Sequence, residues 1–340
     1  MRILCISVHP VLEYDEIQLF ESMGHEIFSL GFYFRRTKPD NLRGPLPETE
    51  WHLACREAFA AHGCAQVRGE TQWRVSRAFC AGFDAVLVHH NVSFIAENWD
   101  ELAGSRVIWR TIGQGLHWAE DRMREYRAQG MKIVRWSPEE RFIERYIGAD
   151  AVIRTAKDPA DWGGWTGTAA RVVTFNNNFR VRGEGMSFDF HQRCVAGLPF
   201  DLYGLGNGDV PDWRGVAGPE EQKALLRRHR LAFLTGTNPA PYTLGFVEAW
   251  MTGIPVVHVG RQRFSKGLTG VYEIDNLIVD GESGFLVNEA KDAAALFRTL
   301  LADHARCAAV SAKGRAAAIA TFGRAQAAAR WAEFLREHLG

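Results

Sequence analysis

The chain contains no hydrophobic run long enough to cross a membrane. A spanning helix needs about 20 consecutive apolar residues, and the first apolar stretch, residues 2–8, ends at His9-Pro10. That stretch is also too short for a secretory signal peptide. We therefore expect translation to begin directly in a first β-strand and the protein to be cytoplasmic. Peripheral attachment at the inner face of the membrane is left open.

Net charge and paired cysteines are lacking as well. The 340 residues contain 40 Lys and Arg and 40 Asp and Glu, which argues against the positive field typical of nucleic-acid-binding proteins. The six cysteines form no Cys-x-x-Cys pair. We expect reduced, partly buried thiols, and neither a disulfide framework nor a zinc site. The sequence contains no aspartate cluster with metal-ligand spacing, and it does not indicate the oligomeric state.

Alternation of strands and helices dominates the first part of the chain. Branched apolar residues at 2–8 and 26–30 predict strands on either side of a helix at 12–23. The same reasoning predicts, in chain order, strands at 84–89, 106–111, 131–135 and 151–154, and helices at 94–102 and 137–146. Strand–helix–strand units of this length are typical of a parallel sheet covered on both faces. We assign residues 1–160 to a first doubly wound domain.

A second alternating region follows a glycine-rich stretch at 161–170, which we interpret as a linker. Residues 171–322 form the second predicted domain, with strands at 171–175, 200–203, 231–235 and 255–259, and helices at 188–196, 220–230, 243–251, 291–301 and 308–320. The fold class is therefore α/β, with two Rossmann-like domains facing a cleft. A final helix within 323–340 carries an apolar stripe that includes Trp331 and Phe334 and needs a surface to bury it.

The most informative segment is Pro241-Tyr-Thr-Leu-Gly-Phe-Val-Glu-Ala-Trp-Met-Thr-Gly-Ile-Pro-Val-Val257. It predicts a loop, the N-terminus of a helix at Thr243, a glutamate one turn inside that helix, a glycine stop and a buried strand. Backbone amides at a helix N-terminus bind phosphate. A carboxylate further along can accept hydrogen bonds from sugar hydroxyls. Spacing alone favours a sugar-nucleotide site no more strongly than an ordinary crossover helix.

Residues 245–257 resemble the signature of GT-B-fold glycosyltransferases, the large retaining group that includes sucrose synthases and bacterial lipopolysaccharide and capsule transferases. A second segment, Ile278-Val-Asp-Gly-Glu-Ser-Gly-Phe-Leu-Val287, resembles the segment that closes the donor domain in that family. The resemblance implies that Glu248 binds the nucleotide ribose and that the backbone at Leu244 and Gly245 meets the distal phosphate, with Tyr242 and Thr243 as further donor-binding residues. It also implies that the final helix crosses back to the first domain.

The basic residues that neutralise the donor pyrophosphate are implied to follow the first strand of the second domain, where this chain has Arg180 and Arg182. One departure concerns the glutamate that the family usually carries ahead of the Thr243 helix. This chain has Pro241 there. The donor sugar and the stereochemical outcome are therefore open.

The acceptor side is expected in the first domain, in loops that follow strands. His9 and Glu13 follow the first strand, and Gln114 and His117 follow the strand at 106–111. A histidine or carboxylate there is a candidate base for an inverting reaction, and these four are the catalytic candidates. Most such residues only bind substrate or cap a turn.

These observations predict a metal-independent glycosyltransferase without a cofactor, in which a nucleotide sugar is the donor substrate. The acceptor would be a carbohydrate or a lipid-linked glycan, as in polysaccharide biosynthesis. Two alternatives remain at this point. The chain is a sugar-nucleotide epimerase of the same fold, or a non-catalytic subunit that binds nucleotide sugar. The sequence identifies neither the sugar, the base nor the linkage.

Overall fold

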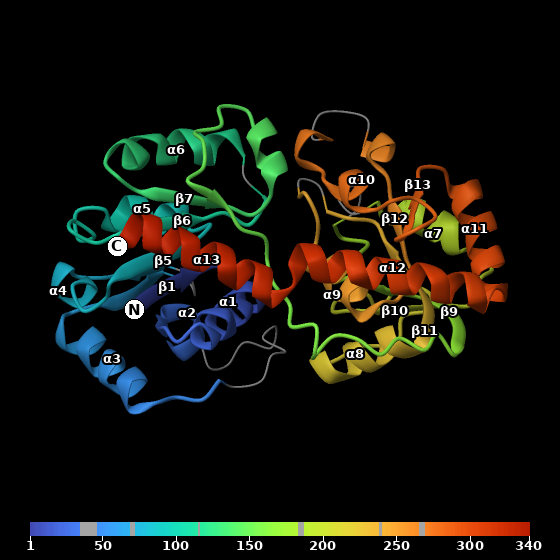
Figure 1. The fold of residues 1–340 in the computed structure, drawn as a ribbon, viewed down its shortest axis with the longest axis horizontal. Helices are drawn as coiled ribbons and strands as arrows, with labels where there is room; N and C mark the ends of the chain where they lie inside the picture. Colours follow the sequence, from blue (N-terminus) through green and yellow to red (C-terminus); the bar gives the residue numbers. More distant parts are fainter. Residues whose placement is uncertain (35–45, 69–71, 115, 183–186, 238–239, 265–268) are drawn as a thin grey trace. The chain divides into compact units, whose positions relative to one another are not determined.

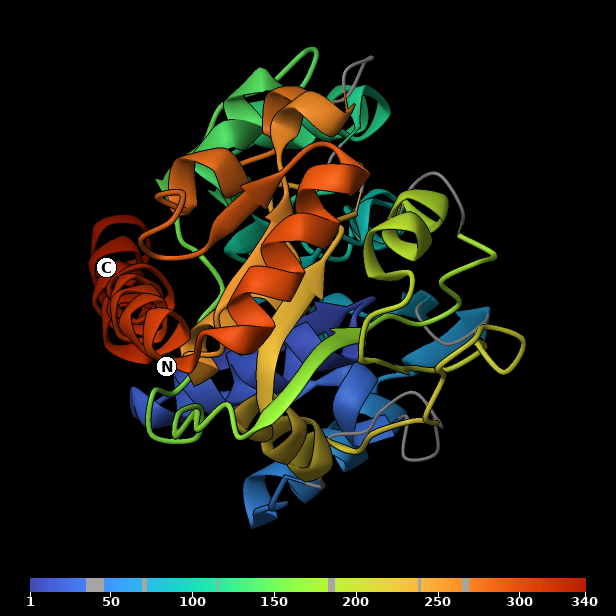
Figure 2. The same cartoon turned by 90° about the vertical axis from the view of Figure 1, so that its right-hand side faces the viewer.

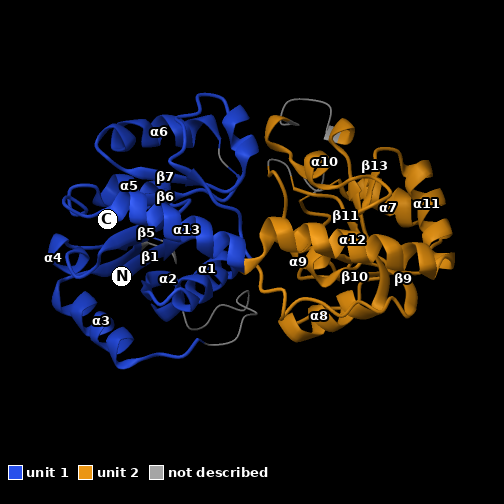
Figure 3. Cartoon of the chain, in the orientation of Figure 1, with its two compact units in different colours: residues 1–156, 325–340 blue, residues 157–324 orange. Residues whose placement is uncertain are grey.

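A parallel β-sheet forms the centre of each half of the chain in the computed structural model, which describes residues 1–34, 46–68, 72–114, 116–182, 187–237, 240–264 and 269–340. The chain divides into two units (Figure 1, Figure 3). Unit 1 comprises Met1–Ala156 and Ala325–Gly340, and unit 2 comprises Lys157–Arg324. The two-domain α/β fold predicted from the alternation is confirmed.

Unit 1 is built on a six-stranded sheet with the order β2-β1-β5-β6-β7-β8, all neighbours parallel. The strands are β1 (Arg2–Ser7), β2 (Glu26–Ser29), β5 (Ala85–His89), β6 (Val107–Arg110), β7 (Lys132–Arg135) and β8 (Ala151–Val152). A two-stranded antiparallel ribbon lies beside it, made of β3 (Ala65–Arg68) and β4 (Gln72–Arg74).

Helices cover both faces of the unit 1 sheet, so every residue of its two central strands, β5 and β6, is buried. Alternate residues of β1 point to opposite faces: Ile3 and Cys5 join one core cluster, and Leu4 and Ile6 join the other. The helices of this unit are α1 (Pro10–Ser22), α2 (Leu30–Phe34), α3 (Glu50–Ala61), α4 (Arg77–Cys80), α5 (Val92–Asn98), α6 (His117–Ala128) and α13 (Arg324–Leu339), with the short 3₁₀ helix η1 (Pro138–Phe142).

The C-terminal helix α13 returns to unit 1, as the resemblance implied. Trp331 is fully buried, and its ring centroid lies 4.9 Å from that of Phe20 in α1. Phe334 and Leu335 bury the rest of the predicted stripe in the same cluster. The apolar face of α13 therefore completes the core on the side of the sheet that α1 covers.

Unit 2 is built on a five-stranded parallel sheet with the order β10-β9-β11-β12-β13. Helices α7 and α11 contribute to the core on one face, and α8 and α9 contact the strands on the other, with α12 beside α9. Figure 2 faces this unit, with the orange-red helix α11 lying along the sheet. The elements are β9 (Ala169–Phe175), α7 (Phe188–Val195), β10 (Phe200–Tyr203), α8 (Pro219–Arg228), β11 (His229–Leu234), α9 (Leu244–Thr252), β12 (Val256–Val259), η3 (Arg261–Phe264), η4 (Thr269–Val271), α10 (Ile274–Leu277), β13 (Phe285–Val287), α11 (Ala290–Ala302) and α12 (His304–Phe322).

Two expected boundaries differ from the structure. The stretch 161–170 belongs to unit 2 and is packed there, because its tryptophans are anchored: Trp162 is buried, and Trp165 Nε1 donates to the carbonyl of His229 at 2.8 Å. The helix expected at 137–146 is only the 3₁₀ helix η1. It ends because Ile143 is extended, with ψ 132°.

All six cysteines are buried and none forms a disulfide. Among the described helices, none combines the length and apolar character that a membrane-spanning helix requires.

Candidate functional site

The Thr243 segment folds as the sequence predicted. Thr243 is the N-cap of α9, and its Oγ1 accepts a hydrogen bond from the Phe246 amide at 3.2 Å. Gly253, with φ 88°, ends the helix in the left-handed conformation that glycine favours. The amides of Leu244 and Gly245 therefore lie at the tip of the helix, just beyond the carboxyl end of β11.

Nothing acidic lies in the first turn of α9. Helices α1 and α6, which follow strands of unit 1, carry Glu13 and Glu120 at that position. An acidic side chain there offsets the positive end of a helix and competes with an external anion. The tip of α9 is thus the more suitable of these three helix ends for a phosphate group.

The side chain of Tyr242 is packed inside unit 2. It is buried, and its ring packs edge-on against Phe322 of α12 with centroids 4.9 Å apart. It fixes the loop that leads into α9, which is a supporting role.

Glu248 lies one turn deeper in α9 and is only 4% exposed. Its Oε1 accepts from Lys157 Nζ at 2.7 Å and its Oε2 from Gln222 Nε2 at 2.8 Å. These contacts hold the carboxylate of Glu248 in a fixed orientation inside unit 2. Lys157 and Gln222 could not be predicted from the sequence, since neither stands in a motif.

Lys157 lies where the chain enters unit 2, beside the segment by which the chain leaves it. Its amide donates to the carbonyl of Phe322 at 2.9 Å, and its own carbonyl accepts from the Arg324 amide at 3.0 Å. An ion pair at 2.8 Å between Arg324 and Asp158 ties the same two segments together. The Lys157–Glu248 pair therefore links α9 to the crossover segments of unit 2.

Arg180 and Arg182 lie in the loop after β9, and both are exposed. Arg180 pairs with Asp209 at 2.7 Å, and the side chains of the two residues are 48% and 59% exposed. Its guanidinium also lies over the Phe188 ring, 5.3 Å from the centroid. An exposed pair of this kind contributes little stability, so Arg180 is available to an anion that competes with Asp209.

The backbone of that loop is held by Asn207, which is fully buried. Its Oδ1 accepts from the Phe179 amide at 2.7 Å, and its Nδ2 donates to the carbonyl of Asn176 at 2.6 Å. Gly204, with φ 136°, must be glycine because a Cβ there would lie 2.0 Å from the same carbonyl oxygen of Asn176. The glycine-rich segment after β10 thus holds the loop that carries Arg180 and Arg182 in place.

The catalytic candidates of unit 1 belong to two segments, the start of α1 and the loop from β6 into α6. His9 is the N-cap of α1, and its Nδ1 lies 3.5 Å from the Leu12 amide. Glu13 is buried and accepts a hydrogen bond from Ser29 Oγ at the end of β2. Gln114 and His117 are exposed, in the loop after β6 and at the first residue of α6. His9 and Glu13 therefore have local structural partners, and the other two are open to solvent.

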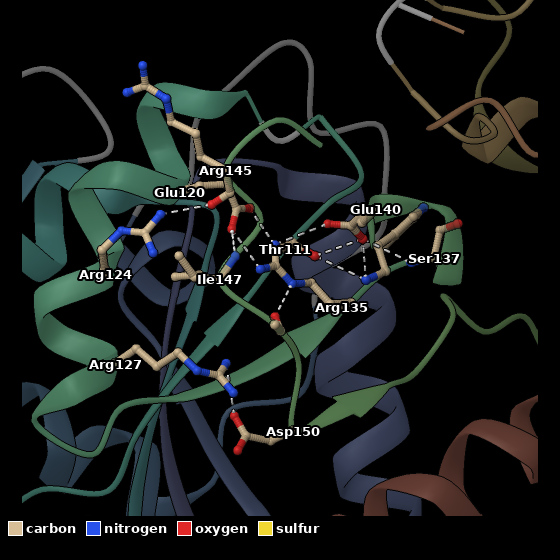
Figure 4. A network of polar contacts seen from close by, with 12 residues as sticks. Thr111, Glu120, Arg124, Arg127, Arg135, Ser137, Glu140, Arg145, Ile147 and Asp150 are labelled. Carbon is tan, nitrogen blue, oxygen red and sulfur yellow. Dashed lines mark hydrogen bonds and ion pairs between the residues drawn. The ribbon is translucent and has the colours of Figure 1, made fainter. Parts of the chain in front are cut away.

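Two buried arginines that the sequence reading did not single out stabilise the carboxyl ends of β6 and β7. Arg135 forms a two-pronged pair with Glu120, at 2.6 and 2.8 Å, and all the atoms of both side chains are buried. Figure 4 shows its guanidinium between Glu120 and Glu140. Arg110 pairs with Glu16 at 3.2 Å and lies over the rings of Trp136 and Trp331.

Glu140 organises the turn after β7. Its Oε1 accepts from Thr111 Oγ1 at 3.0 Å and from the amides of Trp136 and Ser137 at 2.7 and 2.9 Å. Burial raises the pKa of Glu140 and outweighs the opposing effect of Arg135. Glu120 and Glu140 both lie against that one guanidinium.

Among the described residues, no group of three or more His, Cys, Asp or Glu side chains converges to hold a metal ion.

The architecture of two doubly wound α/β units, with a terminal helix that returns to the first, is the GT-B fold. No protein-family model and no curated protein sequence matches the chain. Solved structures match it over nearly its whole length at low identity. Alr3699/HepE from Anabaena, solved in complex with UDP-glucose, has a TM-score of 0.65 and 14% identity, covering 99% of this chain and 100% of that chain.

Two further structures support the same fold. Sucrose-phosphate synthase from Thermosynechococcus elongatus has a TM-score of 0.66 and 15% identity, covering 99% of this chain and 98% of that chain. AviGT4, a glycosyltransferase involved in avilamycin A biosynthesis, has a TM-score of 0.61 and 16% identity, covering 100% of this chain and 98% of that chain. At these identities the likeness establishes the fold.

Proposed function

We propose that this protein is a glycosyltransferase that takes its sugar from a nucleotide-sugar donor bound by unit 2. The observation that carries the proposal is the tip of α9: a threonine-capped helix end without an acidic first turn, at the carboxyl edge of a parallel sheet. Ligands of such sheets bind at that edge. The proposal is supported by the whole-length likeness to a structure that holds UDP-glucose.

The diphosphate of the donor would bind the amides of Leu244 and Gly245, with Arg180 and Arg182 supplying side-chain charge. When the bond from the sugar to the diphosphate breaks, negative charge builds up on the departing oxygen. Helix amides and guanidinium groups held in place stabilise that charge without reorganisation. Glu248 would accept hydrogen bonds from the ribose hydroxyls while Lys157 keeps its carboxylate in position.

Donor binding is tested by a thermal-shift screen of nucleotides and nucleotide sugars, followed by a transfer assay with glycan and lipid-linked acceptors. A ligand present at 100 times its Kd stabilises the protein by about 2.7 kcal/mol. We expect one nucleoside diphosphate and its hexose conjugate to raise Tm most. The proposal is wrong if no nucleotide or nucleotide sugar raises Tm at millimolar concentration.

The ribose contact of Glu248 needs a variant that leaves no buried charge unpaired. Removal of Glu248 alone would leave Lys157 buried without its ion-pair partner and would lower the free energy of unfolding by about 3–5 kcal/mol. The double variant Lys157→Met with Glu248→Gln removes both charges together. We expect wild-type protein to bind the ribonucleotide more tightly than its 2′-deoxy form, and the double variant to lose that preference. An unchanged preference would exclude Glu248 as the ribose ligand.

The acceptor and the place of action belong to the same proposal. We infer a carbohydrate or lipid-linked glycan acceptor and a role in polysaccharide biosynthesis, in the cytoplasm or at the inner face of a membrane. A test is the product formed from labelled donor with a lipid extract compared with soluble oligosaccharides. Incorporation into neither fraction would contradict this part of the proposal.

A further inference from the structure

His258 is a buried histidine near the carboxyl end of β12, and the site described so far does not use it. It is 0% exposed and lies opposite Leu234 of β11 in the sheet register. On the α9 side its ring meets Phe246 edge-on, with centroids 5.5 Å apart. The imidazole therefore lies under the first turn of α9, at residue Phe246 next to Gly245.

The hydrogen bonds of His258 fix which ring nitrogen carries the proton. Nδ1 lies 3.0 Å from the carbonyl oxygen of Val259 and 2.9 Å from the hydroxyl of Tyr272. A carbonyl oxygen only accepts, so Nδ1 is the protonated nitrogen. Burial lowers the pKa of His258 to about 4, so the ring is neutral at neutral pH. Nε2 must then carry a lone pair.

Nε2 is buried and has no hydrogen-bond partner among the described residues. An unsatisfied buried acceptor typically destabilises a protein by about 1–3 kcal/mol. The adjacent ring atom, Cε1, faces Gly236, where a Cβ would lie 3.3 Å from it and 3.3 Å from Tyr272 Cε2. Gly236 has φ 75° and begins the loop that leads from β11 to α9, so the Nε2 edge of the ring lies at the start of that loop.

The lone pair on Nε2 can only accept a hydrogen bond, so its partner must be a hydrogen-bond donor. Phosphate oxygens are acceptors at neutral pH and are repelled by Nε2, whereas a hydroxyl or N–H group can donate to it. The segment 231–247 contains no Asp or Glu, so no carboxylate of that strand, loop and first turn is present to bind sugar hydroxyls. The imidazole supplies an uncharged acceptor in the same part of unit 2.

We infer that Nε2 of His258 accepts a hydrogen bond from a hydroxyl group of the transferred sugar and so helps to select the donor. This inference rests on the proposed function. The phosphate-binding amides of α9 and the hydroxyl-binding imidazole beneath them form two complementary parts of one donor site. The alternative partner of Nε2 is a buried water molecule, which experiment distinguishes.

Calorimetric titration separates the sugar contact from the nucleotide contact. The ligands are the nucleoside diphosphate and nucleotide sugar found in the screen, beginning with UDP and UDP-glucose. We expect His258→Phe to keep the nucleotide Kd within about twofold and to weaken nucleotide-sugar binding about five- to tenfold, as for loss of one neutral hydrogen bond.

His191→Phe is the matched control. His191 is equally buried in unit 2, its pKa is lowered to about 3 by burial, and its Nε2 already contacts Thr174 Oγ1 at 2.9 Å. It belongs to α7 and to the core on the opposite face of the sheet. We expect the ratio of the two Kd values to be the same in His191→Phe as in wild type.

A measurement on the wild-type protein keeps the inference testable if His258→Phe fails to fold. In ¹⁵N-histidine-labelled protein, the unprotonated Nε2 signal of His258 should shift when nucleotide sugar is added and stay in place with nucleotide alone. Binding of the nucleotide sugar with an unchanged Nε2 signal, or an unchanged Kd ratio in His258→Phe, would overturn the inference and leave the proposed function standing. If wild type binds neither ligand class, the proposed function fails as well.

Discussion

The arginines at the carboxyl edges of the two sheets differ in burial and in pairing. In unit 1, Arg110 and Arg135 are almost fully buried and each is paired with a buried glutamate. In unit 2, Arg180 is half exposed and its partner, Asp209, is more exposed still. Charge that is already cancelled inside the protein stabilises structure, whereas charge held at a surface remains available to a ligand.

The helix ends differ in the same sense. The first turns of α1 and α6 contain a glutamate, and the first turn of α9 contains none. The proposed function therefore assigns anion binding to the α9 end of unit 2. The buried arginines of unit 1 hold the loops after β6 and β7, where an acceptor site is expected. Each prediction below changes one side of this contrast.

The largest effect is expected from Arg135→Met in unit 1. The variant leaves Glu120 and Glu140 buried without their shared guanidinium, which typically lowers the free energy of unfolding by about 3–5 kcal/mol. Urea unfolding followed by tryptophan fluorescence measures it. Arg145→Met is the control, because the Arg145 side chain is 53% exposed and should lose less than about 1 kcal/mol. Equal losses in the two variants would remove the contrast with unit 2.

Arg180→Ala in unit 2 should show the reverse behaviour. Loss of a charge-assisted hydrogen bond to phosphate weakens donor binding about ten- to a hundredfold, and the free energy of unfolding changes by less than about 1 kcal/mol. Calorimetry and urea unfolding on the same preparation measure both. The control is Arg193→Ala in α7. A loss of stability without a loss of affinity would show that Arg180 has a structural role, like Arg110 and Arg135, and does not bind the donor.

Gly245→Glu gives α9 the acidic first turn that α1 and α6 have. A Cβ at residue 245 would meet only Thr243 Oγ1, at 3.9 Å, so the position accepts a Cβ without a clash. The added charge should stabilise the helix by about 0.3–1 kcal/mol and weaken nucleotide binding by about tenfold. Gly245→Gln controls for side-chain bulk. If both variants bind nucleotide equally well, the charge at the helix tip is irrelevant to the ligand.

The smallest effect concerns the pH dependence of two buried carboxyl groups. Burial raises the pKa of Glu140, so its contribution to stability is present at low pH and is lost as pH rises through the folded-state pKa. Burial would also raise the pKa of Asp201, but hydrogen bonds from Arg171, His229 and Arg214 hold it well below its usual range. The contribution of Asp201 is therefore present above about pH 4 and is lost as pH falls.

The difference in Tm between wild type and Glu140→Gln should therefore fall with rising pH, while that between wild type and Asp201→Asn should rise. Differential scanning calorimetry between about pH 3 and pH 8 follows both. Slopes of the same sign would contradict the assignment of opposite charge environments to these two carboxyl groups.

The sequence predicted what depends on local pattern. The strands of both sheets except the edge strand β13, the Thr243 cap and the stripe of Trp331 and Phe334 were read from residue type and spacing. Helix α6 was missed because its buried residues, Ala119, Met123 and Tyr126, make a narrow stripe in a strongly charged segment.

Contacts between residues that are distant in the sequence could not be predicted from local sequence patterns. Lys157 and Glu248 are 91 residues apart, and neither neighbourhood indicates the other. The tautomer of His258 depends in the same way on Tyr272, which is 14 residues away. These contacts follow from the folded arrangement of strands and loops, so the residues that support the candidate site appear only in the structure.

Hydrogen exchange of the wild-type protein tests the central claim most directly. The claim is that the donor diphosphate binds the amides at the tip of α9. With the nucleotide found in the screen, peptides that contain Leu244 and Gly245 should become protected, together with the loop of Arg180. Residues 1–34 of unit 1 should exchange as before. Unchanged exchange at Leu244 and Gly245 with nucleotide bound would contradict the account.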